Sequence, residues 1–289
     1  LITREGDPHR RRRALLNPVF KKIRLLDHLP AMTQRAEQLS VQWRDGDEID
    51  VNREMGRLAI AIAGDAIFDA DLSLEGPELL DSLKVMLAAI PRLPIPWPRL
   101  AIARRRVEQT ASRLLTGGLG LHLREGGLSE TAARDEIVAL LIAVIDTTPG
   151  ALAWTWFLLG RHEQSEAALH AELAVVLSGR APTAPDLPHL TFMHAAFNEV
   201  LRLYPPVHFI DRRPLEDVEL NGVRIRAGSW ILLSPLITQR DPRYFDSPES
   251  FQPGRWQQNG KDGRKDVQLS FPFGAGPHGC IGEQLARIA

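Results

Sequence analysis

Apolar side chains recur every three or four residues along most of this 289-residue chain, the spacing that places them on one face of a helix. Four prolines between positions 91 and 98 interrupt one such stretch, because proline lacks a backbone N–H and clashes with the preceding helical turn. Clustered glycines indicate loops where the spacing lapses. The pattern predicts helices in residues 8–44, 55–69, 76–118 (as two helices), 134–179 and 189–203, and loops at Gly117, Gly118 and Gly120 and at Gly126 and Gly127.

The pattern changes after the proline pair at 205–206, which ends the last of these helices. Residues 217–233 alternate apolar and polar side chains around Asn221-Gly222 and Ala227-Gly228, and this alternation predicts one small hairpin. An irregular stretch rich in proline and glycine follows. The sum predicts a mainly α fold with a small β part.

Residues 137–159 form the most apolar stretch of the chain and include one charged residue, Asp146. A transmembrane helix is one interpretation, since about 20 apolar residues can span a bilayer. Asp146 near the centre of the stretch would cost roughly 2.5–3.5 kcal/mol there, and Pro149-Gly150 interrupts it. A helix that is apolar on all sides can also form the buried centre of a large helical domain, and we predict this second arrangement.

The composition is that of an ordinary globular domain, with 44% apolar residues and a formal net charge of -1. A net charge so close to zero gives no general reason to expect nucleic-acid binding. The single cysteine excludes an internal disulfide and fits a reducing compartment, so we expect a cytoplasmic protein. The chain starts at Leu1 and stops inside an expected helix, which suggests a fragment and leaves open a membrane anchor in a longer protein.

The sole cysteine follows a glycine-rich stretch, Phe271-Pro-Phe-Gly-Ala-Gly-Pro-His-Gly-Cys-Ile-Gly282. Four glycines within nine residues let the backbone curl and approach a bound group closely. A last helix is expected to begin at Cys280 or Ile281, and the N–H groups of a helix N-terminus stabilise a thiolate. A thiolate held in a tight glycine loop is the kind of axial ligand that haem iron takes.

Three other interpretations fit parts of this loop. A lone cysteine is most often a small buried hydrophobic residue. Residues 274–279 match the dinucleotide-binding pattern G-x-G-x-x-G, but that reading needs a βαβ unit and an acidic residue about 20 positions later, and the chain ends ten residues after Gly279. Cys280 and His278 could be a nucleophile and its base, although no third group that would orient the base is evident.

The loop resembles the cysteine motif of the cytochrome P450 family at Phe273, Gly274, Gly276, His278, Cys280 and Gly282. The resemblance implies that Cys280 binds the iron of haem b (iron protoporphyrin IX) and that Phe273 packs beside the sulfur. It also assigns Gly274 and Gly282 to the cofactor site. His278 stands where the family usually has an arginine that reaches a haem propionate, and histidine is a weaker, pH-dependent partner for an anion.

A second motif of that family, E-x-x-R, resembles Glu199-Val-Leu-Arg202. The two side chains share one helix face, and such a pair taken alone is usually a solvated ion pair that contributes at most about 1 kcal/mol. The resemblance implies instead a buried structural network whose third member is Arg255, two residues after Pro253. Arginine suits this place because its planar guanidinium pairs with a carboxylate through two hydrogen bonds. The network is expected to hold the chain that leads to Cys280.

A third stretch, residues 143–148, resembles the A-G-x-[D/E]-T-T motif of the family. The resemblance implies that Ala143 lines the distal face of the haem. It also implies that Asp146 and Thr147 are catalytic, because an acid and a hydroxyl beside the cofactor can relay protons to bound dioxygen. The alternative is that the threonine hydroxyls bond back to carbonyls four residues earlier.

Two residues of the same stretch carry further expectations. Val144 replaces the usual glycine, and it is the one feature that favours a peroxide-using or rearranging haem-thiolate enzyme instead; Asp146 and Thr147 argue against that enzyme, which needs no proton relay. Pro149 has no N–H to offer the Ile145 carbonyl, so the helix is predicted to be locally open beside the oxygen site.

Further cofactor contacts are implied near the start of the chain and after the proline pair. His9 and Arg13, one helical turn apart, resemble a W/H-x-x-x-R pair that meets a haem propionate in the family. The arginines at 10–13 alone would equally suit a solvated or nucleic-acid-binding patch. Arg212 stands where the family places another propionate-binding arginine, and Val207 and Phe209 are expected to line the substrate pocket.

The resemblance covers nearly the whole chain and implies a single cytochrome P450 catalytic domain over residues 1–289. The domain is expected to be incomplete, without the usual N-terminal sheet, first helices and C-terminal segment. The implied enzyme is a haem-thiolate monooxygenase that inserts one oxygen atom of O₂ into a lipophilic small molecule. Its electrons would come from a ferredoxin, a flavodoxin-like protein or a reductase, and nucleic acid is not an expected partner. A truncated remnant without function is the remaining alternative.

Overall fold

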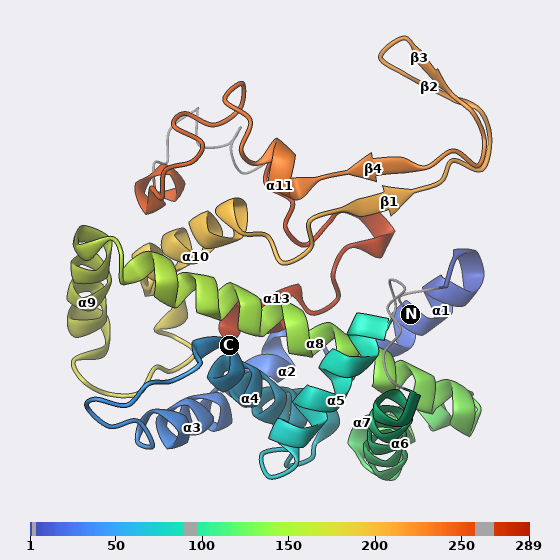
Figure 1. Cartoon of the computed structure of the whole chain (residues 1–289), viewed down its shortest axis with the longest axis horizontal. Helices are drawn as coiled ribbons and strands as arrows, with labels where there is room; N and C mark the ends of the chain where they lie inside the picture. The colour runs from blue at the N-terminus through green and yellow to red at the C-terminus, as the bar shows by residue number, and fades with distance from the viewer. Residues whose placement is uncertain (2–3, 90–96, 258–268) are drawn as a thin grey trace. The chain divides into compact units, whose positions relative to one another are not determined.

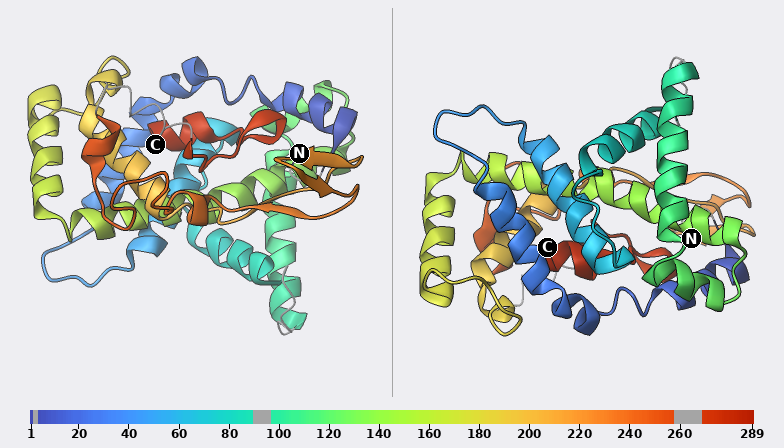
Figure 2. Two further views of the ribbon diagram at one scale, coloured as in Figure 1. Left: turned by 90° about the horizontal axis from the view of Figure 1, so that it is seen from above. Right: turned by 90° about the horizontal axis from the view of Figure 1, so that it is seen from below.

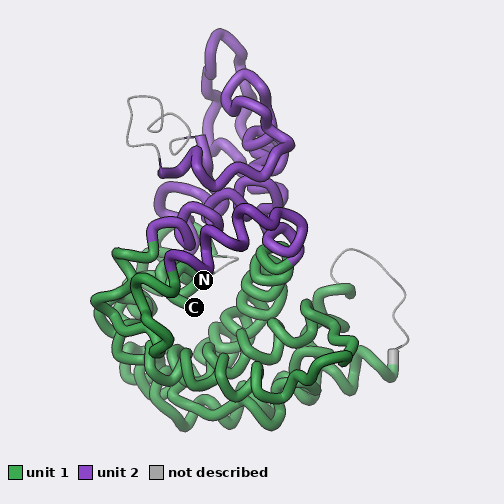
Figure 3. Tube along the Cα trace, turned by 90° about the vertical axis from the view of Figure 1, so that its left-hand side faces the viewer, with its two compact units in different colours: residues 1–156, 173–190, 281–289 green, residues 157–172, 191–280 purple. Residues whose placement is uncertain are grey.

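The computed structural model describes residues 1, 4–89, 97–257 and 269–289. The chain divides into two compact units, which Figure 3 draws in two colours. Unit 1 comprises Leu1–Trp156, Leu173–Leu190 and Ile281–Ala289, and unit 2 comprises Phe157–Glu172 and Thr191–Cys280. Each unit has an apolar core of its own.

Unit 1 is built from helices, which Figure 1 labels in chain order. Two helices, α8 (Glu130–Leu159) and α9 (Glu163–Leu177), have residues in both units. The prediction of one helical stretch over 134–179 therefore missed the break at 160–162. The other elements of this unit are α1 (Gly6–Leu16), α2 (Lys22–Asp27), α3 (Leu29–Ser40), α4 (Val51–Ala63), the π-helical turn η1 (Gly64–Phe68), α5 (Gly76–Ala89), α6 (Trp97–Leu114), α7 (Gly118–Glu125), the 3₁₀ turn η2 (Leu187–His189) and α13 (Glu283–Ile288).

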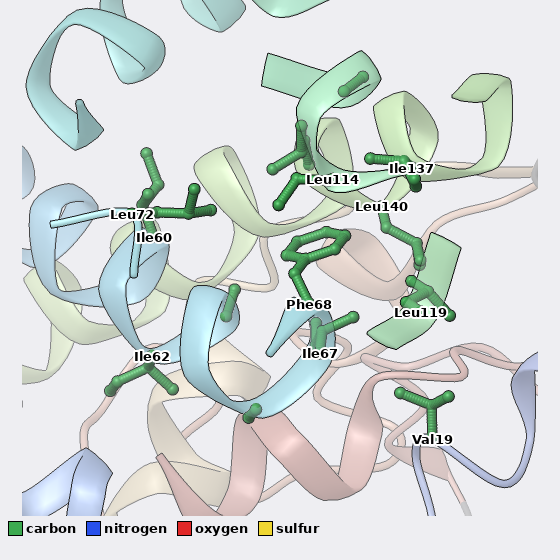
Figure 4. Packing of buried hydrophobic residues seen from close by; sticks show 14 of the residues in the cluster. Val19, Ile60, Ile62, Ile67, Phe68, Leu72, Leu114, Leu119, Ile137 and Leu140 are labelled. Carbon is green, nitrogen blue, oxygen red and sulfur yellow. The ribbon is translucent and has the colours of Figure 1, made fainter. Parts of the chain in front are cut away.

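The core of unit 1 surrounds Phe68, the last residue of η1 (Figure 4). Leu114 of α6, Leu119 of α7, and Ile137 and Leu140 of α8 are buried in the same cluster. Segments that are far apart in the chain, such as those of Phe68 and Leu140, thus bury one another's apolar faces, which is the main favourable contribution to folding. The helices α3 and α4 pack together, both blue in the two views of Figure 2, and α13 packs on α2 although it lies at the other end of the chain.

The glycines at 118 and 120 lie inside α7, so the loop predicted for them is wrong. Their role is close packing. A Cβ on Gly118 would collide with the Asp69 carboxylate, and a Cβ on Gly120 would collide with the backbone of Leu114 and Leu115. At Gly120 the helix therefore keeps a residue of low helix propensity because only a hydrogen atom fits against that backbone, whereas the Asp69 side chain opposite Gly118 can move aside. Gly126 and Gly127 do lie in a loop, as predicted.

Replacing Gly120 with alanine is expected to lower the free energy of unfolding by about 1–3 kcal/mol, because the added methyl group overpacks a rigid backbone contact. Gly150 of α8 is the matched control, since no atom lies within 4 Å of the place where its Cβ would be. Alanine there should raise stability by roughly 0.5–1 kcal/mol through helix propensity. Denaturant titration of both variants measures the difference, and equal effects would contradict the packing argument.

Unit 2 combines short helices with two small antiparallel sheets. Its helical elements besides the end of α8 and the first part of α9 are α10 (Thr191–Leu203), α11 (Pro235–Thr238), and the 3₁₀ turns η3 (Pro253–Trp256) and η4 (Gly276–His278). One sheet pairs β1 (Ile210–Arg212) with β4 (Ile231–Leu233), and the other pairs β2 (Val218–Leu220) with β3 (Val223–Ile225) (Figure 1). The elements of the two units confirm the prediction of a mainly α fold with a small β part.

The single hairpin predicted over 217–233 is half correct. Asn221 and Gly222 form the turn between β2 and β3, both with positive φ, as a tight two-residue hairpin requires. The last strand leaves this hairpin, however, and pairs Ile231 with Arg212 and Leu233 with Ile210 of β1. The turn at Ala227-Gly228 thus returns the chain to an earlier strand, which local alternation could not reveal.

The start of α10 is fixed by the carboxylate of Glu172 from α9. One oxygen accepts the backbone N–H of Phe192 at 2.6 Å, and the other accepts that of Met193 at 2.9 Å. A negative charge here satisfies N–H groups that have no partner within the helix and complements the helix dipole. Farther along α10, Val200 and Leu203 pack with Phe251 in the apolar core of unit 2. This packing sets α10, and with it Glu199 and Arg202, in place.

The apolar helix α8 is only partly buried. Within the described residues it is the one helix long and apolar enough to cross a membrane, and 33% of its most apolar window is buried inside the molecule. Its buried residues include Ile137, Leu141 and Ile145 in the core of unit 1, whereas Trp156 and Phe157 near its end are exposed. Such a helix is weak evidence for a membrane, since core helices of soluble proteins pass the same test. The prediction of a helix buried on all sides was too strong.

Candidate active site

Cys280 ends a loop whose backbone is folded back on itself. The Gly274 N–H donates to the Phe271 carbonyl at 2.9 Å, and the Cys280 N–H donates to the Phe273 carbonyl at 2.8 Å. Gly274 and Gly276 have φ angles of 70° and 74°, a backbone region that residues other than glycine rarely adopt. The glycines are therefore needed for the shape of the loop, and the hydrogen bonds fix where the cysteine sits in it.

The last helix begins later than the sequence predicted. Helix α13 starts at Glu283 and Gly282 is its N-cap, so Cys280 lies three residues before the helix instead of in its first turn. Ile281 and Gly282 form a turn that separates the two. The argument that a helix N-terminus stabilises the thiolate therefore loses its basis, and the backbone of Cys280 is held by the loop itself.

The described residues of the loop fit an axial ligand of haem iron. Cys280 is exposed, so its sulfur is accessible to a bound group, and the interpretation as a buried hydrophobic residue is wrong. The dinucleotide interpretation also fails, because residues 269–273 before the loop contain no strand and α13 has only six residues. Beside Gly276 no atom lies within 4 Å of the position of a Cβ, so the face of the loop is open there.

Glu199 is the centre of a buried hydrogen-bond network in unit 2. Arg202 donates to both of its carboxylate oxygens at 2.8 Å, and both side chains are 0% exposed. Arg255 of η3 donates to one of these oxygens at 3.0 Å. The Trp256 indole N–H and the Gln252 backbone N–H, at 2.8 and 3.0 Å, complete the set. Five donors from α10 and from residues 252–256 thus satisfy one carboxylate, which is the condition for burying a charge.

The remaining N–H groups of Arg202 hold the chain that follows β4. They donate to the carbonyls of Gln239 and Pro248 at 2.7 Å and of Ser250 at 3.1 Å. Sequence reasoning missed these backbone partners, and it missed Trp256, although the residue directly follows Arg255. Nearby, hydrogen bonds from Arg243 lower the pKa of the Asp241 carboxyl below its usual range.

The residues predicted for the distal side lie on α8 in unit 1. Asp146 and Ala143 are exposed and Thr147 is half-buried. The Thr147 hydroxyl donates to the Ala143 carbonyl at 2.7 Å, which is the back-bonded arrangement named as the alternative. Helix α8 is continuous through 145–149, so the local opening predicted at Pro149 is wrong. The loss of one hydrogen bond at a proline is not enough to open a helix held by its neighbours' packing.

The residues predicted to meet the propionates are divided between the units. In unit 1, His9 of α1 is buried, and Arg13, one turn later, donates to the Asn17 side chain at 3.0 Å. In unit 2, Arg212 is exposed at the end of β1 and donates to the Asp211 carbonyl at 2.7 Å. His278 is exposed in η4.

The two pocket residues predicted beside β1, Val207 and Phe209, are 42% and 58% exposed. Exposed apolar side chains of this size in unit 2 are available to an apolar ligand.

An accessible thiol on a hydrogen-bonded glycine loop, together with a buried glutamate–arginine network in a mainly helical fold, is the arrangement expected of a haem-thiolate protein. Residues 110–289 match the family model of cytochrome P450. Together with the relatives described below, this match shows that the chain belongs to the cytochrome P450 family. It is accordingly a monooxygenase that uses haem, O₂ and electrons from a redox partner, and it oxidises a lipophilic substrate.

Relatives are similar over nearly the whole chain. Cyclooctatin synthase of Streptomyces melanosporofaciens is 35% identical, over 98% of this chain and 68% of that protein. Cyclooctat-9-en-7-ol 5-monooxygenase of the same organism is 30% identical, over 99% of this chain and 68% of that protein. The structure of retinoic acid bound cyanobacterial CYP120A1 matches with a TM-score of 0.88 at 24% identity, over 99% of this chain and 70% of that one, which supports the fold.

Proposed function

We propose that Cys280 supplies the thiolate that binds the iron of haem b, and that the enzyme inserts one oxygen atom of O₂ into a C–H bond of its substrate. The observation that carries the proposal is the exposed sole thiol of the chain at the end of a loop fixed by backbone hydrogen bonds. When bound, the haem supplies the activation of dioxygen, which a thiolate ligand favours by donating electron density.

The loop and its surroundings have distinct tasks in this proposal. Gly274 and Gly282 are proposed to let the backbone approach the cofactor, because glycine has no side chain to hold the two apart. Phe273 packs beside the sulfur and limits access of water to it. His278, His9, Arg13 and Arg212 bind the propionates, since cationic or N–H donor groups pair well with carboxylates.

On α8, Ala143 would line the haem because its side chain is small, and Asp146 and Thr147 would hold and pass protons beside it. The Thr147 hydroxyl, bonded to the Ala143 carbonyl, has its hydrogen committed and its oxygen lone pairs available to a donor such as water. The exposed Asp146 carboxylate can exchange protons with solvent, which makes it a suitable source for this relay.

The substrate is proposed to be a lipophilic small molecule of terpenoid type. Support comes from the relative whose name gives cyclooctat-9-en-7-ol as its substrate, and from the apolar side chains of Val207 and Phe209, which are proposed to line the pocket. The electron donor is proposed to be a ferredoxin, a flavodoxin-like protein or a reductase. We further propose one catalytic domain over residues 1–289 and a cytoplasmic location.

The reduced carbon-monoxide difference spectrum of the purified protein tests the function. The absorption band of the thiolate-ligated complex is expected. A protein that binds haem without this band would contradict thiolate ligation, and one that binds no haem would instead support the alternative of a non-functional remnant.

Replacing Thr147 with alanine separates the monooxygenase from a peroxide-using enzyme. The expected result is a severalfold lower yield of product per O₂ consumed, with the difference released as hydrogen peroxide, because the proton relay is impaired. Thr155→Ala is the matched control, since the Thr155 hydroxyl makes the same bond to the Ala151 carbonyl, at 2.8 Å, in the same helix. Equal product yields in the two variants would favour the peroxide-using alternative.

A further inference from the structure

Gln239 is a fully buried amide, 0% exposed, whose hydrogen-bonding groups are all engaged. Its Nε2 donates to the carbonyls of Leu201 and Arg202, both at 3.1 Å. Its Oε1 accepts the backbone N–H of Phe271 at 2.9 Å and the Ser270 hydroxyl at 3.2 Å. One side chain therefore connects the end of α10 with the residues that begin the cysteine loop.

The Phe271 N–H is the first link of a short series of backbone bonds that ends at the cysteine. The Phe271 carbonyl accepts the N–H of Gly274. The carbonyl of Phe273, the residue directly before Gly274, accepts the N–H of Cys280. A displacement of Phe271 would thus be passed to Cys280 through two hydrogen bonds and a few covalent bonds.

The other end of the connection is rigid. The two carbonyls that Gln239 contacts belong to the last turn of α10, where carbonyls have no partner within the helix. Arg202 donates in return to the Gln239 carbonyl at 2.7 Å, and the same guanidinium is held by Glu199. Gln239 is therefore fixed through both its main chain and its side chain to the buried network of unit 2.

We propose that Gln239 is a positioning residue for the Cys280 thiolate, holding the start of the cysteine loop at a set distance from α10. This inference rests on the proposed function of Cys280. Glutamine suits the position because one end of its side chain donates twice and the other accepts twice. Glutamate, of the same shape, presents an acceptor to the Leu201 and Arg202 carbonyls, and asparagine is one methylene too short to reach both ends.

The test uses the haem-loaded protein with Gln239→Glu, at equal haem content. The rate at which the thiolate carbon-monoxide complex converts to the form without thiolate ligation is expected to rise by roughly 10-fold or more, the size of effect found for groups that orient metal ligands. Gln42→Glu is the matched control. Gln42 is exposed and also donates through Nε2 to a backbone carbonyl, that of Gln38 at 2.8 Å, so its conversion rate should equal that of the unsubstituted protein.

If the Gln239→Glu protein does not accumulate, the Gln239→Asn variant is measured instead, since it keeps the amide and adds no charge. It should also raise the rate at which the carbon-monoxide complex loses thiolate ligation. A conversion rate in the variant equal to that of the control overturns the inference, even where the variant is less stable to heat, because a merely structural role lowers stability without changing thiolate ligation. Absence of the thiolate band from the unsubstituted protein overturns the proposed function itself.

Discussion

Replacing Cys280 with serine is expected to remove the thiolate absorption band and to abolish monooxygenase activity. Serine keeps the size of the side chain and the loop hydrogen bond of its backbone, but an alcohol is not ionised at neutral pH and is a poor donor to iron. The loss should exceed the roughly 10–100-fold that follows from changing a group which only orients a metal ligand. Product formation and the reduced carbon-monoxide spectrum measure it.

Ala275→Ser is the control for this prediction, because it adds a hydroxyl to an exposed position of the same loop and leaves the thiol in place. The control should retain the band. A Cys280→Ser protein has no thiol left, since the sequence has one cysteine, so if it kept both the band and its activity, thiolate ligation by this chain would have to be abandoned.

Replacing Glu199 with glutamine is expected to lower the free energy of unfolding by about 3–5 kcal/mol, the cost of breaking a buried ion pair by removing one partner. The guanidiniums of Arg202 and Arg255, 0% and 8% exposed as side chains, would then face a neutral amide that also brings two donors of its own. A loss of this size is a large fraction of the stability of a typical domain. Chemical denaturation followed by circular dichroism measures it.

The comparison for Glu199 is Glu108→Gln, which breaks the exposed pair of Glu108 with Arg104 on α6. Solvent and salt already screen that pair, so its removal should leave the midpoint of unfolding unchanged within error. If the two substitutions destabilised the protein equally, the effect at Glu199 would reflect loss of charge in general and not the buried network.

The parts of the site that sequence predicted depend on short spacings. Glu199 and Arg202 are three residues apart on a helix, so their spacing alone places them on one face, and the structure has them in direct contact. The bonds of Gln239 could not be predicted in this way. Its partners are 31 to 38 residues distant in the chain, and an isolated glutamine has no pattern that indicates which backbone groups it will satisfy.

The errors in the fold have the same origin. Glycine is a poor helix former, so Gly120 was predicted to lie in a loop. It lies in α7, because the close packing of α7 against the backbone of Leu115 leaves no room for a side chain there. Strand β4 lies within the stretch predicted to form one hairpin, but its partner is β1, which is more distant in the sequence. Pro149 removes one hydrogen bond from α8, while the packing of residues such as Ile145 keeps the helix continuous. In each instance a tertiary contact outweighs a local preference.

Arg202 binds the carbonyls of Gln239, Pro248 and Ser250, and these hydrogen bonds limit local unfolding of the segment that contains them. If residues 239–250 detached from α10, the buried Arg202 guanidinium would lose these hydrogen bonds without gaining bonds to water. Local fluctuations that expose this segment alone are therefore costly. Amide hydrogens of the segment and of α10 should exchange with deuterium together, as one cooperative unit, although most of the segment has no regular secondary structure.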